Sequence, residues 1–264
     1  MSRVVIVTGG GTGIGAAIAR QLSTAGEQVV ICGRREEPLR AVAESCGAHV
    51  VVADVSTPEG VAAVVDGAVA VFGRLDGLVV NHGIIHVGGL ADVTVEQWEE
   101  TLRVNLSGPF LLMQAAMPHL VESRGAIVAV SSEAGLRASD GMTAYSASKA
   151  GLSMLTQSVA VEYGPAGVRA NVICPGWTAT EMGDMEMAEL GAERGISAED
   201  AYRLSTSLVP LRRAASSEEI ASVAAWLLSD AASYLNGVLL PVDGGGTMVD
   251  AATLALDPRV SVDY

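Results

Sequence analysis

The chain has 264 residues, half of them apolar and 17% charged, which is typical of a folded globular protein and excludes a disordered one. Its formal net charge of −14 disfavours nucleic acids and membranes as partners, because both attract proteins with excess Lys and Arg. The three cysteines have no metal-ligand spacing, so we expect reduced thiols, a cytoplasmic location and no metal site. No apolar run is long enough to span a membrane, and the first strand pattern starts too close to Met1 for a signal peptide.

Short apolar runs alternate with helical patterns along the chain. Each run is continuously apolar, as expected of a parallel strand that helices cover on both faces. The runs span residues 3–8, 28–32, 49–55, 77–81, 125–132, 169–174 and 237–243. The helical patterns span residues 14–25, 36–45, 58–72, 94–122, 142–163 and 217–229. This order predicts a single α/β domain over residues 1–264, a Rossmann fold with a doubly wound, seven-stranded parallel sheet flanked by helices.

Two segments fall outside this alternation. Residues 177–216 contain no strand pattern but carry Trp177 and several methionines, which favours a substrate loop or lid over a solvated surface excursion. Ser216 and Glu219 have the spacing of a capping box, which predicts that the next helix begins directly after this segment. From about residue 248 the chain continues as a C-terminal tail, to which the sequence assigns no role.

The first strand runs directly into the glycine-rich stretch "TGGGTGIG". Glycines allow a tight turn and a close approach of the backbone to a phosphate, and the helix that follows directs its free N–H groups at the same point. Gly11, Gly13 and Ala16 fit the dinucleotide pattern G-x-G-x-x-A. The order strand, loop, helix therefore predicts a nucleotide-binding site.

The end of the second strand, "ICGRREEPL", bears on the choice of cofactor. An acidic residue at this point binds the ribose of NAD, whereas an arginine favours the 2′-phosphate of NADP. Here Gly33 follows the strand and is itself followed by Arg34 and Arg35. Glu36 and Glu37 come next and are close enough to reach the ribose. The sequence favours NADP(H), with NAD(H) as the alternative.

The stretch "TAYSASKAGL" places Tyr145 and Lys149 four residues apart among Ser, Ala and Gly. On a helix these two side chains project from the same face. Two interpretations fit this pattern: a helix that packs closely through its small residues, or a reactive Tyr–Lys pair that a substrate can approach.

Taken together, these motifs resemble the short-chain dehydrogenase/reductase (SDR) family over almost the whole chain, from Val4 to about Thr247. The resemblance rests on "TGGGTGIG", on Asp54 in "ADV", on "VNHG" at 80–83, on Asn105 in "RVNLSGPF", on "YSASK" with Ser132 thirteen residues before its tyrosine, and on "CPGWTAT". It implies a cofactor site formed by Thr8, Gly9, Gly11, Thr12, Gly13, Ile14, Gly15, Gly33, Arg34, Arg35, Asp54, Val55, Asn81, His82, Gly83, Tyr145, Lys149, Pro175, Gly176, Thr178 and Thr180.

The resemblance also implies a catalytic set. Tyr145 is expected to be the general acid/base, with Lys149 lowering the pKa of its phenol and holding the nicotinamide ribose. Ser132 is expected to hydrogen-bond the substrate oxygen, and Asn105 to hold a water that links Lys149 to solvent. The implied activity is hydride transfer between a nicotinamide cofactor and a ketone or secondary alcohol.

Two residues depart from the family pattern. His82 replaces an alanine beside the cofactor and is either a second polar group of the site or, as we favour, a side chain that fills space. Glu133 follows Ser132 and either points to solvent or disfavours anionic substrates. The expected substrate pocket consists of Glu133, Trp177, Met182 and Met185.

Two other functions remain open: reduction of 3-oxoacyl thioesters on an acyl carrier protein, and cofactor binding without turnover. Carrier proteins are acidic, so a net charge of −14 slows their encounter with this chain, and Ala166 stands where carrier-dependent relatives often have an arginine. We therefore expect a small or medium-sized neutral carbonyl or alcohol substrate. Apolar residues on several faces of 94–122 and 142–163, the helices through which relatives assemble, predict a homotetramer or a dimer.

Overall fold

The computed structural model describes residues 2–250 and 257. Most of the predicted C-terminal tail, residues 251–256 and 258–264, lies outside the described residues. Within the described ranges, no helix is long and apolar enough to cross a membrane.

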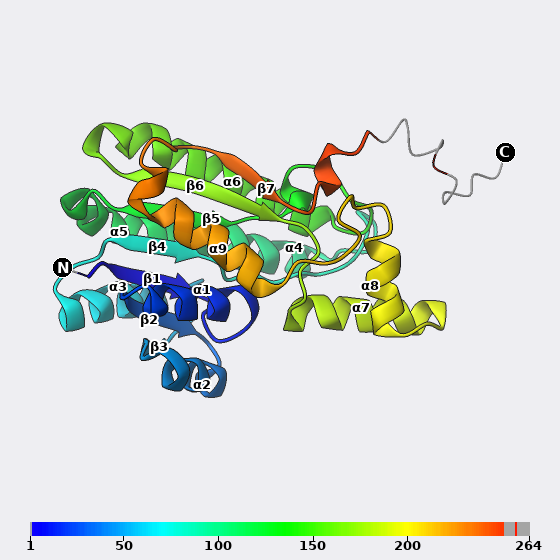
Figure 1. Cartoon of the computed structure of the whole chain (residues 1–264), viewed down its shortest axis with the longest axis horizontal. Helices are drawn as coiled ribbons and strands as arrows, with labels where there is room; N and C mark the ends of the chain where they lie inside the picture. The colour runs from blue at the N-terminus through cyan, green and yellow to red at the C-terminus, as the bar shows by residue number, and fades with distance from the viewer. Residues whose placement is uncertain (1, 251–256, 258–264) are drawn as a thin grey trace.

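A parallel seven-stranded sheet forms the centre of the molecule (Figure 1), as the sequence predicts. Its order is β3-β2-β1-β4-β5-β6-β7. The chain first adds β2 and β3 on one side of β1 and then adds β4 to β7 on the other side, so the order of strand addition reverses between β1 and β4. In open parallel sheets this reversal creates a crevice at the carboxyl ends of the strands, where ligands bind. The strands are β1 (Val4–Thr8), β2 (Gln28–Gly33), β3 (His49–Val52), β4 (Gly77–Val80), β5 (Ala126–Val130), β6 (Arg169–Pro175) and β7 (Leu239–Val242).

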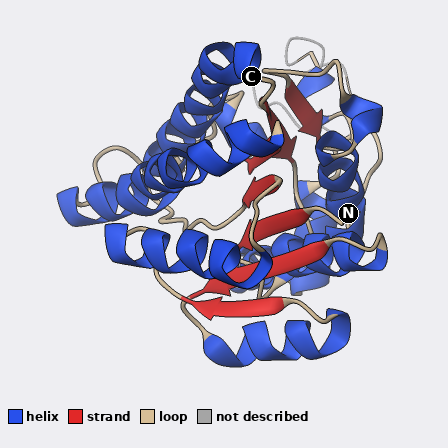
Figure 2. Ribbon diagram, turned by 90° about the vertical axis from the view of Figure 1, so that its left-hand side faces the viewer, coloured by secondary structure: helices blue, strands red, loops and turns tan. Residues whose placement is uncertain are grey.

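Helices cover both faces of the sheet, so that the strands lie between two helical layers (Figure 2). Successive strand residues point to opposite faces: Val5 and Val7 belong to the core shared with α1, α2 and α9, whereas Val4 and Ile6 belong to the core shared with α3, α5 and α6. The α-helices of the described residues are α1 (Gly13–Thr24), α2 (Glu36–Cys46), α3 (Pro58–Phe72), α4 (Val95–Leu102), α5 (Gly108–Ser123), α6 (Thr143–Tyr163), α7 (Glu181–Arg194), α8 (Ala198–Ser205) and α9 (Ser217–Leu228).

The predicted helix 94–122 is interrupted. A π-helical turn at Arg103–Ser107 separates α4 from α5 and carries Asn105. Such turns contain one more residue per turn than an α-helix and are frequent at functional sites. An extra residue in a single turn hardly changes the apolar periodicity, so the sequence pattern reads as one continuous helix.

The segment 177–216 has no strand of the sheet, as predicted, but most of it is helical rather than irregular. The side chains of Thr180 and Ser197 cap α7 and α8 by accepting hydrogen bonds from the backbone N–H groups of Gly183 and Asp200, each at 3.1 Å. The two helices lie beyond the carboxyl ends of the strands (Figure 1). The capping box of Ser216 and Glu219 is present at the start of α9, as predicted.

Candidate active site

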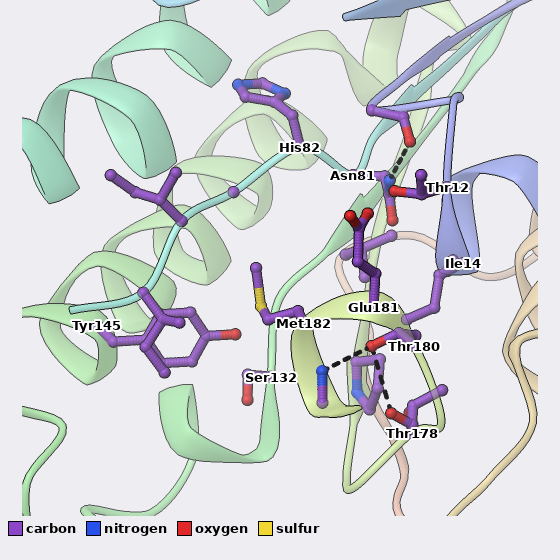
Figure 3. Close-up of a pocket in the computed structure, with 18 of the residues that line it drawn as sticks. Thr12, Ile14, Asn81, His82, Ser132, Tyr145, Thr178, Thr180, Glu181 and Met182 are labelled. Carbon is purple, nitrogen blue, oxygen red and sulfur yellow. Dashed lines mark hydrogen bonds between the residues drawn. The ribbon is translucent and has the colours of Figure 1, made fainter. Parts of the chain in front are cut away.

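The loops after β1, β2, β4, β5 and β6 line a cavity of about 830 Å³ at the carboxyl edge of the sheet, and the start of α7 closes one side (Figure 3). The predicted site residues that line it are Gly9, Gly11, Thr12, Gly13, Ile14, Gly33, Arg34, Arg35, Asp54, Val55, Asn81, His82, Gly83, Ser132, Glu133, Tyr145, Lys149, Pro175, Gly176, Trp177, Thr178, Thr180, Met182 and Met185. Three further predicted site residues, Thr8, Gly15 and Asn105, lie outside this lining, and their predicted roles stay predictions.

The glycine loop fits a phosphate. Gly9 and Gly13 have φ of +63° and +51°, a backbone conformation that favours glycine. A Cβ on Gly15 would lie 2.3 Å from the Gly9 carbonyl oxygen, so this position needs glycine for packing within the loop rather than for ligand contact. The Thr12 side chain makes no capping hydrogen bond to α1, which leaves N–H groups of the first turn available to an anion.

Thr8 joins the ends of β1 and β4 from beneath the cavity. Its buried hydroxyl oxygen accepts hydrogen bonds from the backbone N–H groups of Asn81 at 2.9 Å and His82 at 3.2 Å. The same hydroxyl lies 2.8 Å from His82 Nδ1 and donates to the Val79 carbonyl at 3.3 Å.

Burial lowers the pKa of His82 to about 4, and the charge of Lys149 acts in the same direction. The imidazole is therefore neutral at physiological pH. Its ring turns away from Tyr145 (Figure 3). These observations support the interpretation of His82 as a space-filling side chain, with the addition that it is hydrogen-bonded to Thr8.

The opposite end of the cavity begins where β2 and β3 end. Gly33 is the last residue of β2, and Arg34 beside it is exposed. The Asp54 carboxylate accepts a hydrogen bond from Ser56 N–H at 2.9 Å. Burial would raise the pKa of Asp54, but the hydrogen bonds from Ser56 and the charge of Arg34 lower it overall. Arg35 instead forms a bidentate ion pair with Glu181 of α7, at 2.8 and 2.7 Å.

Tyr145 and Ser132 meet at the other end of the cavity. Ser132 lies just beyond β5, where its hydroxyl oxygen accepts a hydrogen bond from Ala134 N–H at 3.1 Å. The side chains of Tyr145, Ser132 and Met182 point into the same part of the cavity (Figure 3). The structure thus brings together the Tyr and Ser that the sequence spaces thirteen residues apart.

Lys149 lies one helical turn from Tyr145 and is buried. Its ammonium donates a hydrogen bond to the Val130 carbonyl at 3.0 Å and lies 5.6 Å from the centre of the Tyr145 ring. Burial lowers the pKa of Lys149 to about 8.

The phenol of Tyr145 does not have the low pKa that the sequence led us to expect. Burial raises its pKa to about 12, the Ser132 hydroxyl opposes this shift, and the negative charges of Glu186 and Glu133 add to it. Lys149 lies 5.6 Å from the centre of the Tyr145 ring, and its ammonium donates to the Val130 carbonyl. Desolvation therefore dominates over the lysine.

Asn105 lies behind the cavity wall and is fully buried. Its side chain bonds both backbone groups of Ile84, each at 2.9 Å, and donates to the Ser148 hydroxyl at 3.0 Å. A Cβ on Gly83 would lie 3.3 Å from both Asn105 Oδ1 and Lys149 Nζ. Asn105 thus fixes the loop after β4 against α6 beside the lysine, and its role in holding a water stays a prediction.

The wall around Tyr145 is acidic. Burial and the neighbouring Asp243 raise the pKa of Glu133 to about 7, and burial and Glu189 raise that of Glu186 to about 7. Glu133 lines the cavity and does not point away into solvent. This arrangement favours the interpretation that Glu133 disfavours anionic substrates.

Several lining residues were not predicted from the sequence. Glu181 and Glu186 both come from α7. Glu186 is one helical turn after Met182, so a helical spacing within the lid segment was the signal that could have identified it. Ile84, Ile85, Asp140 and Met142 also line the cavity.

Comparison with known proteins agrees with this geometry. A family model described as enoyl-(acyl carrier protein) reductase matches residues 9–247. The chain is 41% identical to protein MoaE of Klebsiella aerogenes over 257 residues, which cover 97% of this chain and 99% of that protein. It is 38% identical to D-threitol dehydrogenase of Mycolicibacterium smegmatis, with 93% of each chain covered. The chain belongs to the short-chain dehydrogenase/reductase family.

Solved structures of SDR proteins share its fold. Levodione reductase superimposes with a TM-score of 0.89 at 35% identity, covering 94% of this chain and 98% of that one. An actinorhodin polyketide ketoreductase crystallised with NADPH has a TM-score of 0.88 at 31% identity, covering 92% and 97%. The 3-ketoacyl-(acyl-carrier-protein) reductase of Brucella melitensis, complexed with NADH, has a TM-score of 0.83 at 29% identity, also covering 92% and 97%. This SDR chain is thus similar both to a protein solved with NADPH and to one solved with NADH.

Proposed function

We propose that this SDR protein is an NADP(H)-dependent oxidoreductase that interconverts a small or medium-sized neutral ketone and its secondary alcohol. The observation that carries this proposal is the convergence of Ser132, Tyr145 and Lys149 at one end of a cavity whose other end is a phosphate-binding glycine loop. A nicotinamide cofactor, when bound there, supplies or accepts the hydride.

Tyr145 is proposed as the general acid/base. A phenol with a pKa of about 12 keeps its proton at neutral pH, so it is ready to protonate a carbonyl oxygen. The Ser132 hydroxyl, which points into the same space, orients that oxygen. Lys149, with a pKa of about 8, exchanges protons readily near physiological pH and lies one turn from the phenol.

The acidic wall supports an uncharged substrate over an anionic one. Glu133 and Glu186 line the cavity next to Tyr145, and the ionised fraction of each, which grows as the pH rises above its pKa of about 7, repels a negative group. The same argument weighs against an acyl carrier protein, which would bring its own negative charge to a chain of net charge −14. The α7–α8 segment, with Met182 and Met185 on the cavity, is proposed to close over the substrate as a lid.

The preference for NADP(H) is proposed from Gly33 and Arg34. Gly33 leaves the end of β2 without a carboxylate, and the exposed Arg34 lines the cavity next to it. An arginine at this point offers its planar fork to a 2′-phosphate. The relatives do not decide the matter, because one similar protein was solved with NADPH and another with NADH.

The test is a panel of neutral ketones and alcohols screened with both cofactors by nicotinamide absorbance, in the wild type and in Tyr145→Phe. We expect Tyr145→Phe to lower kcat by roughly 10²-fold or more, the scale of general acid–base catalysis, while cofactor binding is retained. Equal turnover by the two proteins would refute the assignment of Tyr145. Cofactor binding without turnover of any compound in the panel would instead favour a binding protein without catalysis.

A further inference from the structure

Arg35 and Glu181 form an ion pair between two parts of the chain that are 146 residues apart. Arg35 is the residue directly before α2, in the loop after β2, where dinucleotide-binding folds bind the adenosine ribose. Glu181 is the first residue of α7. Both nitrogen atoms at the end of the guanidinium donate to the carboxylate, at 2.8 and 2.7 Å, in the parallel geometry that suits arginine and carboxylate best.

The pair lies at the glycine loop. Both residues line the cavity, and Thr180, directly before Glu181, lies against the loop: a Cβ on Gly13 would be 3.2 Å from Thr180 Cγ2. The Glu181 carboxylate is turned toward Thr12 (Figure 3), whose hydroxyl also lowers the pKa of this carboxyl. Glu181 thus connects the ribose-recognition loop to α7 at the edge of the phosphate site.

The two adjacent arginines are therefore not equivalent. The hydrogen bond from Arg35 is the main cause that lowers the pKa of Glu181, and Glu181 in turn raises the pKa of Arg35, so both groups stay ionised at physiological pH. Arg34 is exposed, and its charge acts on the neighbouring Asp54. A 2′-phosphate can approach Arg34 directly, but it reaches the fork of Arg35 only by displacing a carboxylate.

We propose that Glu181 is a cofactor-specificity residue, which acts by holding Arg35 away from the 2′-phosphate of NADP(H). This inference rests on the proposed nicotinamide-dependent function and narrows it. The affinity of a ligand falls in proportion to the fraction of molecules in which its binding group is free. The ion pair therefore weakens NADP(H) binding and leaves the binding of NAD(H), which has no 2′-phosphate, unaffected.

The experiment is a double-mutant cycle on cofactor binding. Isothermal titration measures the Kd of NADP⁺ and NAD⁺ for the wild type, Glu181→Gln, Arg35→Ala and the double variant. Glu181→Gln keeps the size of the side chain and removes its charge, so we expect NADP⁺ to bind about 2- to 5-fold more tightly, the range of an exposed ion pair. NAD⁺ affinity should stay the same. Arg35→Ala alone should have little effect, but it should abolish the gain in the double variant.

Glu199→Gln is the matched control. Glu199 is an exposed residue of α8 that pairs with Arg203 at 2.6 Å and does not line the cavity, so the substitution removes the same charge elsewhere. We expect no change in the ratio of the two Kd values. Three results would each overturn the proposal. The first is an equal gain in affinity for NAD⁺ and NADP⁺ in Glu181→Gln, and the second is a gain in NADP⁺ affinity that persists when Arg35→Ala is added. The third is the same gain in NADP⁺ affinity in Glu199→Gln. Failure of the wild type to bind either cofactor would overturn the proposed function itself.

Discussion

Replacing the buried lysine of the site should make the protein more stable while it abolishes activity. Lys149 is the only lysine of the chain, it is 4% exposed, and its ammonium donates a hydrogen bond to the Val130 carbonyl. A charge in such a place is retained for function at the expense of stability. Lys149→Met keeps the length of the side chain and removes the charge, and a thioether packs well against an aromatic ring such as that of Tyr145.

The magnitude follows from the pKa. Burial lowers it from 10.5 to about 8, which corresponds to about 3 kcal/mol of destabilisation when the lysine is charged in both the folded and the unfolded state. The variant leaves the Val130 carbonyl without its donor, which costs about 1 kcal/mol. We therefore expect Lys149→Met to be about 2 kcal/mol more stable than the wild type at pH 7.

The pH dependence has a definite sign. Between about pH 8 and pH 10.5 the unfolded chain binds a proton on this lysine that the folded chain does not, so the stability of the wild type rises with pH in this window. Below pH 8 the full destabilisation is present, and above pH 10.5 it disappears. Near pH 9.5 the destabilisation by the buried lysine should have fallen to roughly 1.5 kcal/mol. The free energies of unfolding of the wild type and Lys149→Met should therefore lie closer together at pH 9.5 than at pH 7.

Urea unfolding of both proteins from pH 7 to pH 9.5 measures this difference. Because the chain has a single lysine, an amine-selective reagent used across the same pH range reports the pKa of Lys149 with only the terminal amine as competitor. The reasoning is refuted if Lys149→Met is less stable than the wild type at pH 7, or if the difference between the two proteins is independent of pH.

Three further predictions concern the cofactor, the lid and assembly. Arg34→Ala should lower kcat/KM for NADPH by about 10-fold, the lower end for loss of a charge-assisted hydrogen bond, and leave kcat/KM for NADH nearly unchanged. Gly33→Asp should reverse the cofactor preference. If Arg34→Ala has the same ratio of kcat/KM for NADPH and NADH as the wild type, the NADP assignment is refuted. Amide hydrogen exchange in residues 177–216 should slow when cofactor and substrate bind, and unchanged protection would contradict a lid. Exposed apolar side chains on α5 and α6, among them Phe110 and Met154, favour a homotetramer, whereas a monomer by light scattering at micromolar concentration would exclude one.

The sequence by itself determined the features that depend on local order along the chain. Continuously apolar runs identified the seven strands, because a strand buried on both faces admits few polar residues. The glycine loop was recognisable because its backbone conformation needs glycine, as the positive φ of Gly9 and Gly13 shows. Tyr145 and Lys149 were recognisable as a pair because a spacing of four residues places two side chains on one face of any helix.

Only the tertiary structure decided what depends on neighbours distant in the sequence. From the sequence, Arg35 is expected to be free to bind a phosphate, but in the fold it is paired with Glu181. No local sequence pattern predicts a contact between residues that are 146 positions apart. The phenol of Tyr145 was expected to have a low pKa because its lysine is close in sequence. Its pKa is raised instead, because the elements packed around the site bury the phenol, and the turn after β5 and α7 add the negative charges of Glu133 and Glu186. Sequence spacing therefore identified which groups meet, and the burial created by folding decided their charges.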